Sequence, residues 1–252
     1  MARISHAGNS AYSALVAALV LCAVLLAPRA LAQEQGERAA VPSAGRVDYD
    51  VIRDGDKIGT YSVMFWHDGR HLTIATWTDI SVTLLGIPFY RFHYEANEEW
   101  VNDRLTRLTS RTDNNGTALS ASLARDGTRI RGTCNGIALD LPADRLPISM
   151  WHPDFVHQSI ILDQYKCVER TIRTTDAGTE PVSAGVRTVA TRHYAITGQL
   201  HRDVWYGPDG QVVQVRFPAR DGSQIAFVMR TPSQPPLAPA QNASSPPVQR
   251  TR

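Results

Sequence analysis

Seven two-residue turn signals, each an Asp or Asn followed by Gly, constrain the fold of this 252-residue chain more than any other feature. Asp and Asn tolerate a positive φ and Gly adopts it freely, which the tight turns of β-hairpins require. Between the signals, apolar or β-branched residues alternate with polar ones at a period of two, the pattern of half-buried strands. The signals are Asp54-Gly55, Asp68-Gly69, Asn115-Gly116, Asp126-Gly127, Asn135-Gly136, Asp209-Gly210 and Asp221-Gly222.

The alternation predicts about twelve antiparallel strands in one domain that spans residues 47–230. It is interrupted at 142–164, where large apolar residues recur at spacings of three and four and Pro153 suits the first turn of a helix running to about Leu162. We therefore expect a mainly β protein in which a single antiparallel, curled or partly closed β-barrel-like sheet carries one short inserted helix. A two-sheet sandwich is the alternative. The expected strands are 47–53, 57–67, 71–84, 88–101, 105–112, 117–125, 128–134, 137–141, 168–174, 186–197, 200–206 and 211–230, the last broken at Asp221-Gly222.

The two ends of the chain lack this pattern. Residues 1–32 are typical of a cleaved signal peptide, because Arg3 precedes an unbroken 14-residue apolar run and Ala30-Leu31-Ala32 suits signal peptidase. The run is shorter than the roughly 20 residues that span a bilayer, which argues against an uncleaved membrane anchor. No later segment is apolar enough to span a membrane, so we expect no stable membrane insertion after cleavage. Residues 33–46 are expected to be a flexible segment and 231–252 a disordered Pro/Ser-rich tail. The expected location is the periplasm or the cell exterior.

Charge argues against nucleic acid as a partner. The full chain carries a formal charge of +2, but loss of residues 1–32 would leave 24 basic and 24 acidic side chains. A chain without excess positive charge lacks the electrostatic attraction on which binding to nucleic acid or to anionic lipid depends, so neither is an expected partner. The oligomeric state cannot be inferred from composition.

Two cysteines would be left after signal cleavage, Cys134 and Cys167. An even number in an oxidising compartment predicts a disulfide between them, which would cross the expected helical insertion. Two unpaired structural thiols are the alternative.

No catalytic or metal-binding motif is evident. The chain contains no G-x-S-x-G sequence, no His-Glu-x-x-His sequence and no Gly-rich phosphate loop, so we predict no metal site and no cofactor. The alternative to a non-catalytic protein is a periplasmic hydrolase with an unrecognised His/Asp site. His93, His193 and Asp203 are then the first candidates.

An aromatic stripe supplies candidate residues for a binding cavity. Tyr90, Phe92 and Tyr94 occupy alternate positions of one expected strand and so share a face. With Trp151 they are candidate walls of a pocket for an apolar small molecule or lipid on the concave face of the sheet. The competing interpretation is that they are ordinary core aromatics. We accordingly predict an exported, non-catalytic envelope protein that binds an apolar or amphipathic ligand.

Four groups of short segments also resemble a known family. They are Tyr49-Asp50-Val51 with Arg53-Asp54-Gly55 and Ile58-Gly59; Leu84-Leu85-Gly86 with Tyr90-Arg91-Phe92; Leu146-Pro147 with Trp151-His152-Pro153; and Arg192-His193-Tyr194 through Gly198 to Asp203-Val204-Trp205-Tyr206. Over about residues 47–230 the chain resembles the exported bacterial family called domain of unknown function 6134. The resemblance implies an exported β-rich domain and supplies no catalytic residue. In architecture alone, the expected sheet is loosely similar to periplasmic lipoprotein carriers.

Overall fold

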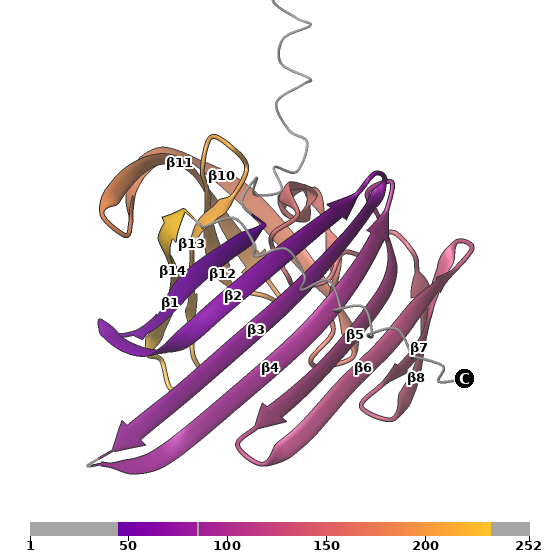
Figure 1. Ribbon diagram of the computed structural model, residues 1–252, viewed down its shortest axis with the longest axis horizontal. Helices are drawn as coiled ribbons and strands as arrows, with labels where there is room; N and C mark the ends of the chain where they lie inside the picture. Colours follow the sequence, from indigo (N-terminus) through magenta and orange to yellow (C-terminus); the bar gives the residue numbers. More distant parts are fainter. Residues whose placement is uncertain (1–44, 85, 233–252) are drawn as a thin grey trace, which may run out of the picture. The chain divides into compact units, whose positions relative to one another are not determined.

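The structure of the protein is a computed structural model that describes residues 45–84 and 86–232 (Figure 1). The predicted signal peptide lies outside the described residues, as do most of the predicted N-terminal segment and of the C-terminal tail. The first strand begins at Arg46 and the last ends at Pro232. Within the described ranges, no helix is long and apolar enough to cross a membrane.

The described chain forms one antiparallel sheet of fourteen strands. Two meanders, β1 to β8 and β9 to β14, are joined by the pairing of β1 with β14, and the sheet order is β8-β7-β6-β5-β4-β3-β2-β1-β14-β13-β12-β11-β10-β9. Figure 1 shows β2 to β8 side by side in one curled layer. The strands are β1 (Arg46–Arg53), β2 (Asp56–Asp68), β3 (His71–Leu84), β4 (Ile87–Val101), β5 (Arg104–Asn114), β6 (Thr117–Asp126), β7 (Arg129–Cys134), β8 (Ile137–Pro142), β9 (Ile160–Asp163), β10 (Val168–Ala184), β11 (Arg187–Gly198), β12 (Arg202–Tyr206), β13 (Val212–Pro218) and β14 (Gln224–Pro232).

The predicted hairpin pattern is confirmed. All seven Asp-Gly and Asn-Gly signals lie at connections between consecutive strands, and Asp54 adopts the positive φ of 48° that such a turn needs. The sheet has fourteen strands instead of about twelve for two reasons. The expected final strand is two strands, β13 and β14, separated by the turn at Asp221-Gly222, and β9 lies where a helix was expected.

The inserted helix is shorter than predicted. It is a five-residue 3₁₀-helix, Pro153–His157, whose first turn is capped by the His152 side chain, which accepts a hydrogen bond from the Asp154 backbone N–H. The chain becomes extended at Gln158, and β9 then pairs with the start of β10. Ile161 and Leu162 in β9 are both fully buried. A strand covered on both faces has no period-two pattern, so its apolar residues were mistaken for a helical face.

The two edges of the open sheet, β8 and β9, are fastened together. The predicted disulfide is confirmed, with an S–S distance of 2.03 Å between Cys134, at the end of β7, and Cys167, in the turn between β9 and β10. Ile148, in the segment that connects β8 to β9, donates its backbone N–H to the Leu162 carbonyl at 3.1 Å. The disulfide and this contact hold the edges of the curled sheet near each other without closing it into a barrel.

The connecting segment, residues 143–159, fills part of the core. Ile148, Met150, Trp151 and Phe155 all belong to the buried apolar cluster that the strands contribute to, and Phe155 is completely buried. The segment therefore covers part of the apolar face of the sheet, and the remainder lines a cavity.

Candidate functional site

A cavity of about 590 Å³ lies on the apolar face of the sheet. Its size is within the range of small-molecule sites, about 300–1,000 Å³. The walls are mostly apolar and come from both meanders and from the connecting segment; they include Ile58, Ile80, Val82, Phe89, Leu119, Phe217, Ile225 and Phe227. The curl of a single sheet therefore brings side chains far apart in sequence around one space.

Three of the four predicted wall residues line this cavity, namely Tyr90, Phe92 and Tyr94 of β4. They share a face because alternate residues of a strand point the same way. On neighbouring β3, Val82 pairs with Tyr90 and Ile80 pairs with Phe92. Residues directly opposite in an antiparallel pair have their side chains on the same side of the sheet, so β3 and β4 build one continuous apolar wall.

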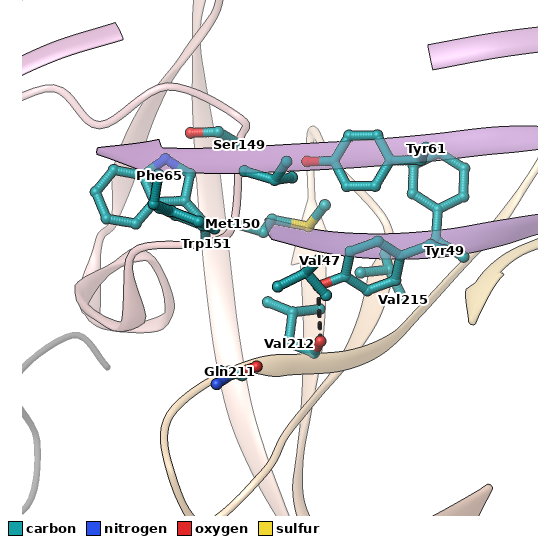
Figure 2. Close-up of a pocket in the computed structure, with 12 residues that line it drawn as sticks. Val47, Tyr49, Tyr61, Phe65, Ser149, Met150, Trp151, Gln211, Val212 and Val215 are labelled. Carbon is teal, nitrogen blue, oxygen red and sulfur yellow. Dashed lines mark hydrogen bonds between the residues drawn. The ribbon is translucent and has the colours of Figure 1, made fainter. Parts of the chain in front are cut away.

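Trp151, the fourth predicted wall residue, does not line the large cavity. It lies in the core, with its ring centroid 5.1 Å from that of Trp100 and 5.9 Å from that of Phe65. There it borders a second cavity of only about 20 Å³, drawn in Figure 2. Such a space holds about one water molecule, so it is no site for an organic ligand. Trp151 thus helps to close the interior.

Glu98 of β4 also lines the large cavity and is only 2% exposed. One carboxylate oxygen, Oε2, accepts hydrogen bonds from the indole N–H groups of Trp100 at 3.0 Å and Trp151 at 3.1 Å. Burial raises the pKa of this carboxyl, and the hydrogen bonds from the two indoles and from Ser149 oppose the rise. Glu98 therefore ties β4 to the connecting segment at the cavity wall.

Arg202 of β12 places a cationic group in the same wall. Its guanidinium lies over the Phe217 ring at 4.7 Å, and one terminal nitrogen, Nη1, is 3.5 Å from the Met150 sulfur. Its Nε is shielded from solvent and has no hydrogen-bond partner among the described residues. Burial lowers the pKa of this guanidinium, although an arginine stays charged at any physiological pH.

Polar groups from the turn after β9 face Tyr94. The Gln164 side-chain amide donates to the Tyr94 hydroxyl at 3.2 Å, and the Tyr165 ring lies 4.6 Å from the Tyr94 ring. Burial raises the pKa of both tyrosines, so their hydroxyls stay protonated and can donate hydrogen bonds. The cavity thus combines apolar walls with a few polar groups, as ligand sites do.

Two of the three candidate hydrolase residues do meet. His193 of β11 and Asp203 of β12 are 2.8 Å apart through His193 Nε2, while Nδ1 is 3.2 Å from a Glu180 carboxylate oxygen. The imidazole is stacked on Trp205, with ring centroids 4.3 Å apart. Because carboxylates occupy both ring nitrogens, neither is left to take a proton from a nucleophile. This arrangement lacks the geometry of a catalytic triad.

His93, the third candidate, is held in the same manner. Its ring nitrogens lie 2.6 Å from Asp79 and 3.1 Å from Glu95, on an exposed part of β4. The hydrogen bond to Asp79 is the main reason that its pKa is raised, followed by that to Glu95. In the described part of the chain, no three His, Cys, Asp or Glu side chains gather closely enough to hold a metal ion.

Sequence reasoning did not select Glu98 or Arg202 as site residues. The signal that could have identified them is the alternation of side chains between the two faces of a strand. Glu98 is four positions from Tyr94, and Arg202 is two from the buried Val204, so each is a charged residue at an inward-facing position. Charged side chains are seldom buried without a partner or a function, which makes such positions informative.

Comparisons with known proteins agree with this fold. The family model "Domain of unknown function (DUF6134)" matches residues 49–230. A crystal structure of a beta-barrel-like protein of domain of unknown function DUF1849 from Brucella abortus is similar with a TM-score of 0.53 and 10% identity, over 73% of this chain and 95% of that chain. At this identity the likeness shows the fold alone. No curated protein matches the chain by sequence.

Proposed function

Because the chain belongs to the DUF6134 family, whose name assigns no chemistry, we propose its function from the cavity: a non-catalytic protein that binds an apolar or amphipathic molecule. The observation that carries this proposal is the cavity of about 590 Å³ on the apolar face of the sheet. Small-molecule sites are typically clefts or cavities lined mainly by apolar side chains, with a few polar groups. A space this large, walled by aromatic and aliphatic side chains, is what a guest molecule would fill.

Several features favour binding over hydrolysis. Among the described residues that line the cavity there is no histidine, and the indoles of Trp100 and Trp151 both donate to the buried Glu98 oxygen. A carboxylate that accepts hydrogen bonds from two indoles positions those side chains. The imidazoles of His93 and His193 are held between carboxylates and are absent from the cavity lining.

We further propose that the protein works outside the cytoplasm, in the periplasm or beyond it. The Cys134–Cys167 disulfide supports this location, since structural disulfides persist in oxidising compartments and are rare in reducing ones. N-terminal sequencing of the protein recovered from its host should begin at or near Gln33. Recovery of the intact chain in the cytoplasm would contradict the proposal.

The binding proposal is tested with a neutral apolar dye, N-phenyl-1-naphthylamine, whose fluorescence rises in apolar surroundings. We expect saturable binding with a dissociation constant in the micromolar range. The variant Val82→Trp, which adds bulk to the cavity wall, should weaken binding several-fold. Ser81→Trp is the matched control, because its exposed side chain is on the opposite face of the same strand. Absence of saturable binding, or equal effects of the two variants, would refute the proposal.

A further inference from the structure

We propose that the ligand is an anionic amphiphile, with a carboxylate or phosphate head group bound by Arg202 and an apolar chain lying against the wall made by β3 and β4. This inference rests on the proposed binding function and specifies the class of ligand. It follows from the surroundings of Arg202, the charge of the cavity lining and the placement of the apolar wall.

Arg202 is half-buried, and the shielded part of its guanidinium lacks a hydrogen-bond partner among the described residues. Its recorded contacts are the Phe217 ring and the Met150 sulfur, a weak acceptor, and its shielded Nε has no acceptor among the described residues. An unpaired charge away from water is costly in a folded protein. An anionic head group would supply the missing acceptor, and guanidinium matches carboxylate and phosphate in shape, since it donates two parallel hydrogen bonds.

The carboxylate of Asp163, which interacts electrostatically with Arg202, is engaged elsewhere. Its Oδ2 accepts from Arg170 Nε at 2.6 Å. Its Oδ1 accepts from the backbone N–H groups of Tyr165 at 3.1 Å and Lys166 at 3.0 Å. Asp163 therefore organises the turn after β9 and leaves Arg202 without an ion pair in the described structure.

The lining as a whole is cationic. Among the lining residues that the structure describes, four are basic and two are acidic; they are Arg53, Lys166, Arg202 and Arg220, and Glu98 and Asp221. Arg53 forms an ion pair with Asp221, and Glu98 is held by two indoles. This local excess of positive charge in a chain of nearly balanced charge favours an anionic guest.

Hydrogen-bond donors and apolar walls complete the arrangement. Tyr61 and Tyr165 also line the cavity and add hydroxyl donors to its polar groups. Ile80, Val82 and Phe92 supply an apolar surface on β3 and β4. A molecule with one anionic end and one apolar end matches both regions, whereas a fully apolar guest leaves Arg202 unpaired.

The test compares ligands that share a 16-carbon chain and differ in the head group: hexadecanoate, hexadecyl phosphate, hexadecanol and hexadecyltrimethylammonium. Each displaces N-phenyl-1-naphthylamine from the full chain, below the concentration at which the ligand forms micelles. We expect at least one anionic ligand to bind about ten-fold or more tightly than hexadecanol, as a charge-assisted hydrogen bond would give. The cationic ligand should bind most weakly. The ranking of carboxylate against phosphate identifies the kind of head group.

The variant Arg202→Met removes the charge and keeps an unbranched apolar stem. We expect it to lose the preference for the anionic ligand while its affinity for hexadecanol stays the same or rises. Arg216→Met is the matched control, because Arg216 lies on neighbouring β13 over the Trp205 ring and is absent from the cavity lining. It should retain the wild-type preference.

The outcomes separate the two proposals. Equal binding of hexadecanol and both anionic ligands by the wild type would overturn the assignment of Arg202 and leave the binding function intact. So would an Arg202→Met variant that keeps the preference. Failure of the dye and all four ligands to bind would overturn the binding function itself. The wild-type comparison decides the head-group question even where a variant does not fold.

Discussion

Replacement of Glu98 by leucine should destabilise the protein strongly, although the substitution places an apolar residue in an apolar interior. The carboxylate oxygen accepts from Trp100 on its own strand and from Trp151 in the connecting segment. A leucine side chain at this position would leave both indole N–H groups buried without an acceptor. Because Trp151 is 53 residues from Glu98 in sequence, the loss should also loosen the segment that covers the core.

The magnitude follows from these two donors. A buried donor without an acceptor costs about 1–3 kcal/mol, so two cost about 2–6 kcal/mol. The leucine side chain recovers part of this through apolar burial, on the order of 1–2 kcal/mol beyond the glutamate stem that it replaces. We therefore expect the free energy of unfolding to fall by about 3 kcal/mol, which is a large part of the stability of an ordinary domain.

Urea unfolding, followed by tryptophan fluorescence, measures this change. Glu99→Leu is the control, because Glu99 is the exposed neighbour on the same strand and its ion pair with Arg107 is long, at 3.5 Å. We expect it to change stability by less than about 0.5 kcal/mol. A Glu98→Leu variant as stable as the wild type would show that the indole hydrogen bonds do not hold the segment and would refute the reasoning.

The pH dependence of Glu98→Gln tests the same group independently. The folded pKa of Glu98 is raised, so between the unfolded value of about 4.3 and the folded value the native state holds a proton that the unfolded chain has lost. The wild-type free energy of unfolding therefore decreases as pH rises from the unfolded pKa of Glu98 to its folded pKa. Glutamine keeps an acceptor oxygen but does not titrate. The variant should therefore gain stability relative to the wild type as pH rises from about 4 to about 8, and a constant difference would contradict the raised pKa.

Three further predictions concern other parts of the fold. Replacing both Cys134 and Cys167 by Ala should lower the free energy of unfolding by about 3.7 kcal/mol on the chain-entropy model, measured against the wild type in urea without reductant; unchanged stability would contradict it. Gly59→Ala should cost roughly 3 kcal/mol, because the new Cβ would lie 2.1 Å from the carbonyl oxygen of Asp79 on β3; a thermal melt equal to that of the wild type would show that the strands separate freely. Asp79→Asn should lower the pKa of His93 towards the ordinary histidine value of about 6.5 in an NMR titration, since the Asp79 hydrogen bond is the main cause of its rise, and an unmoved pKa would assign the rise to Glu95.

The hairpins were predictable because their determinants are local. Each Asp-Gly or Asn-Gly pair specifies a positive φ within two residues, and the alternation on either side specifies which face is apolar. The same parity places Tyr90, Phe92 and Tyr94 on one face, and it puts buried Glu98 and exposed Glu99 on opposite faces.

The remaining features could not be predicted from the sequence because they depend on contacts between residues far apart in the chain. Strand β9 carries no alternation because both its faces are covered, and β10 continues to Ala184, beyond the expected end at 174, through a largely exposed stretch without an apolar pattern. The place of Trp151 depends on how the 143–159 segment folds back onto β4. The cavity depends on the curl of the sheet, which no single strand specifies.

The pairing of β1 with β14 places the first and last strands of the domain side by side in the middle of the sheet. Val47 is opposite Pro232, so the two ends of the described fold lie close together. All the other strand pairings in the described sheet join strands that are consecutive in sequence. A circular permutant that joined 232 to 46 by a short turn and began within 143–159 would be one uninterrupted meander. In the natural order, the pairing of β1 with β14 closes the longest loop and is expected to form most slowly. In the permutant, the same pairing would be a hairpin between consecutive strands. The Cys134–Cys167 bridge would then restrain the new termini.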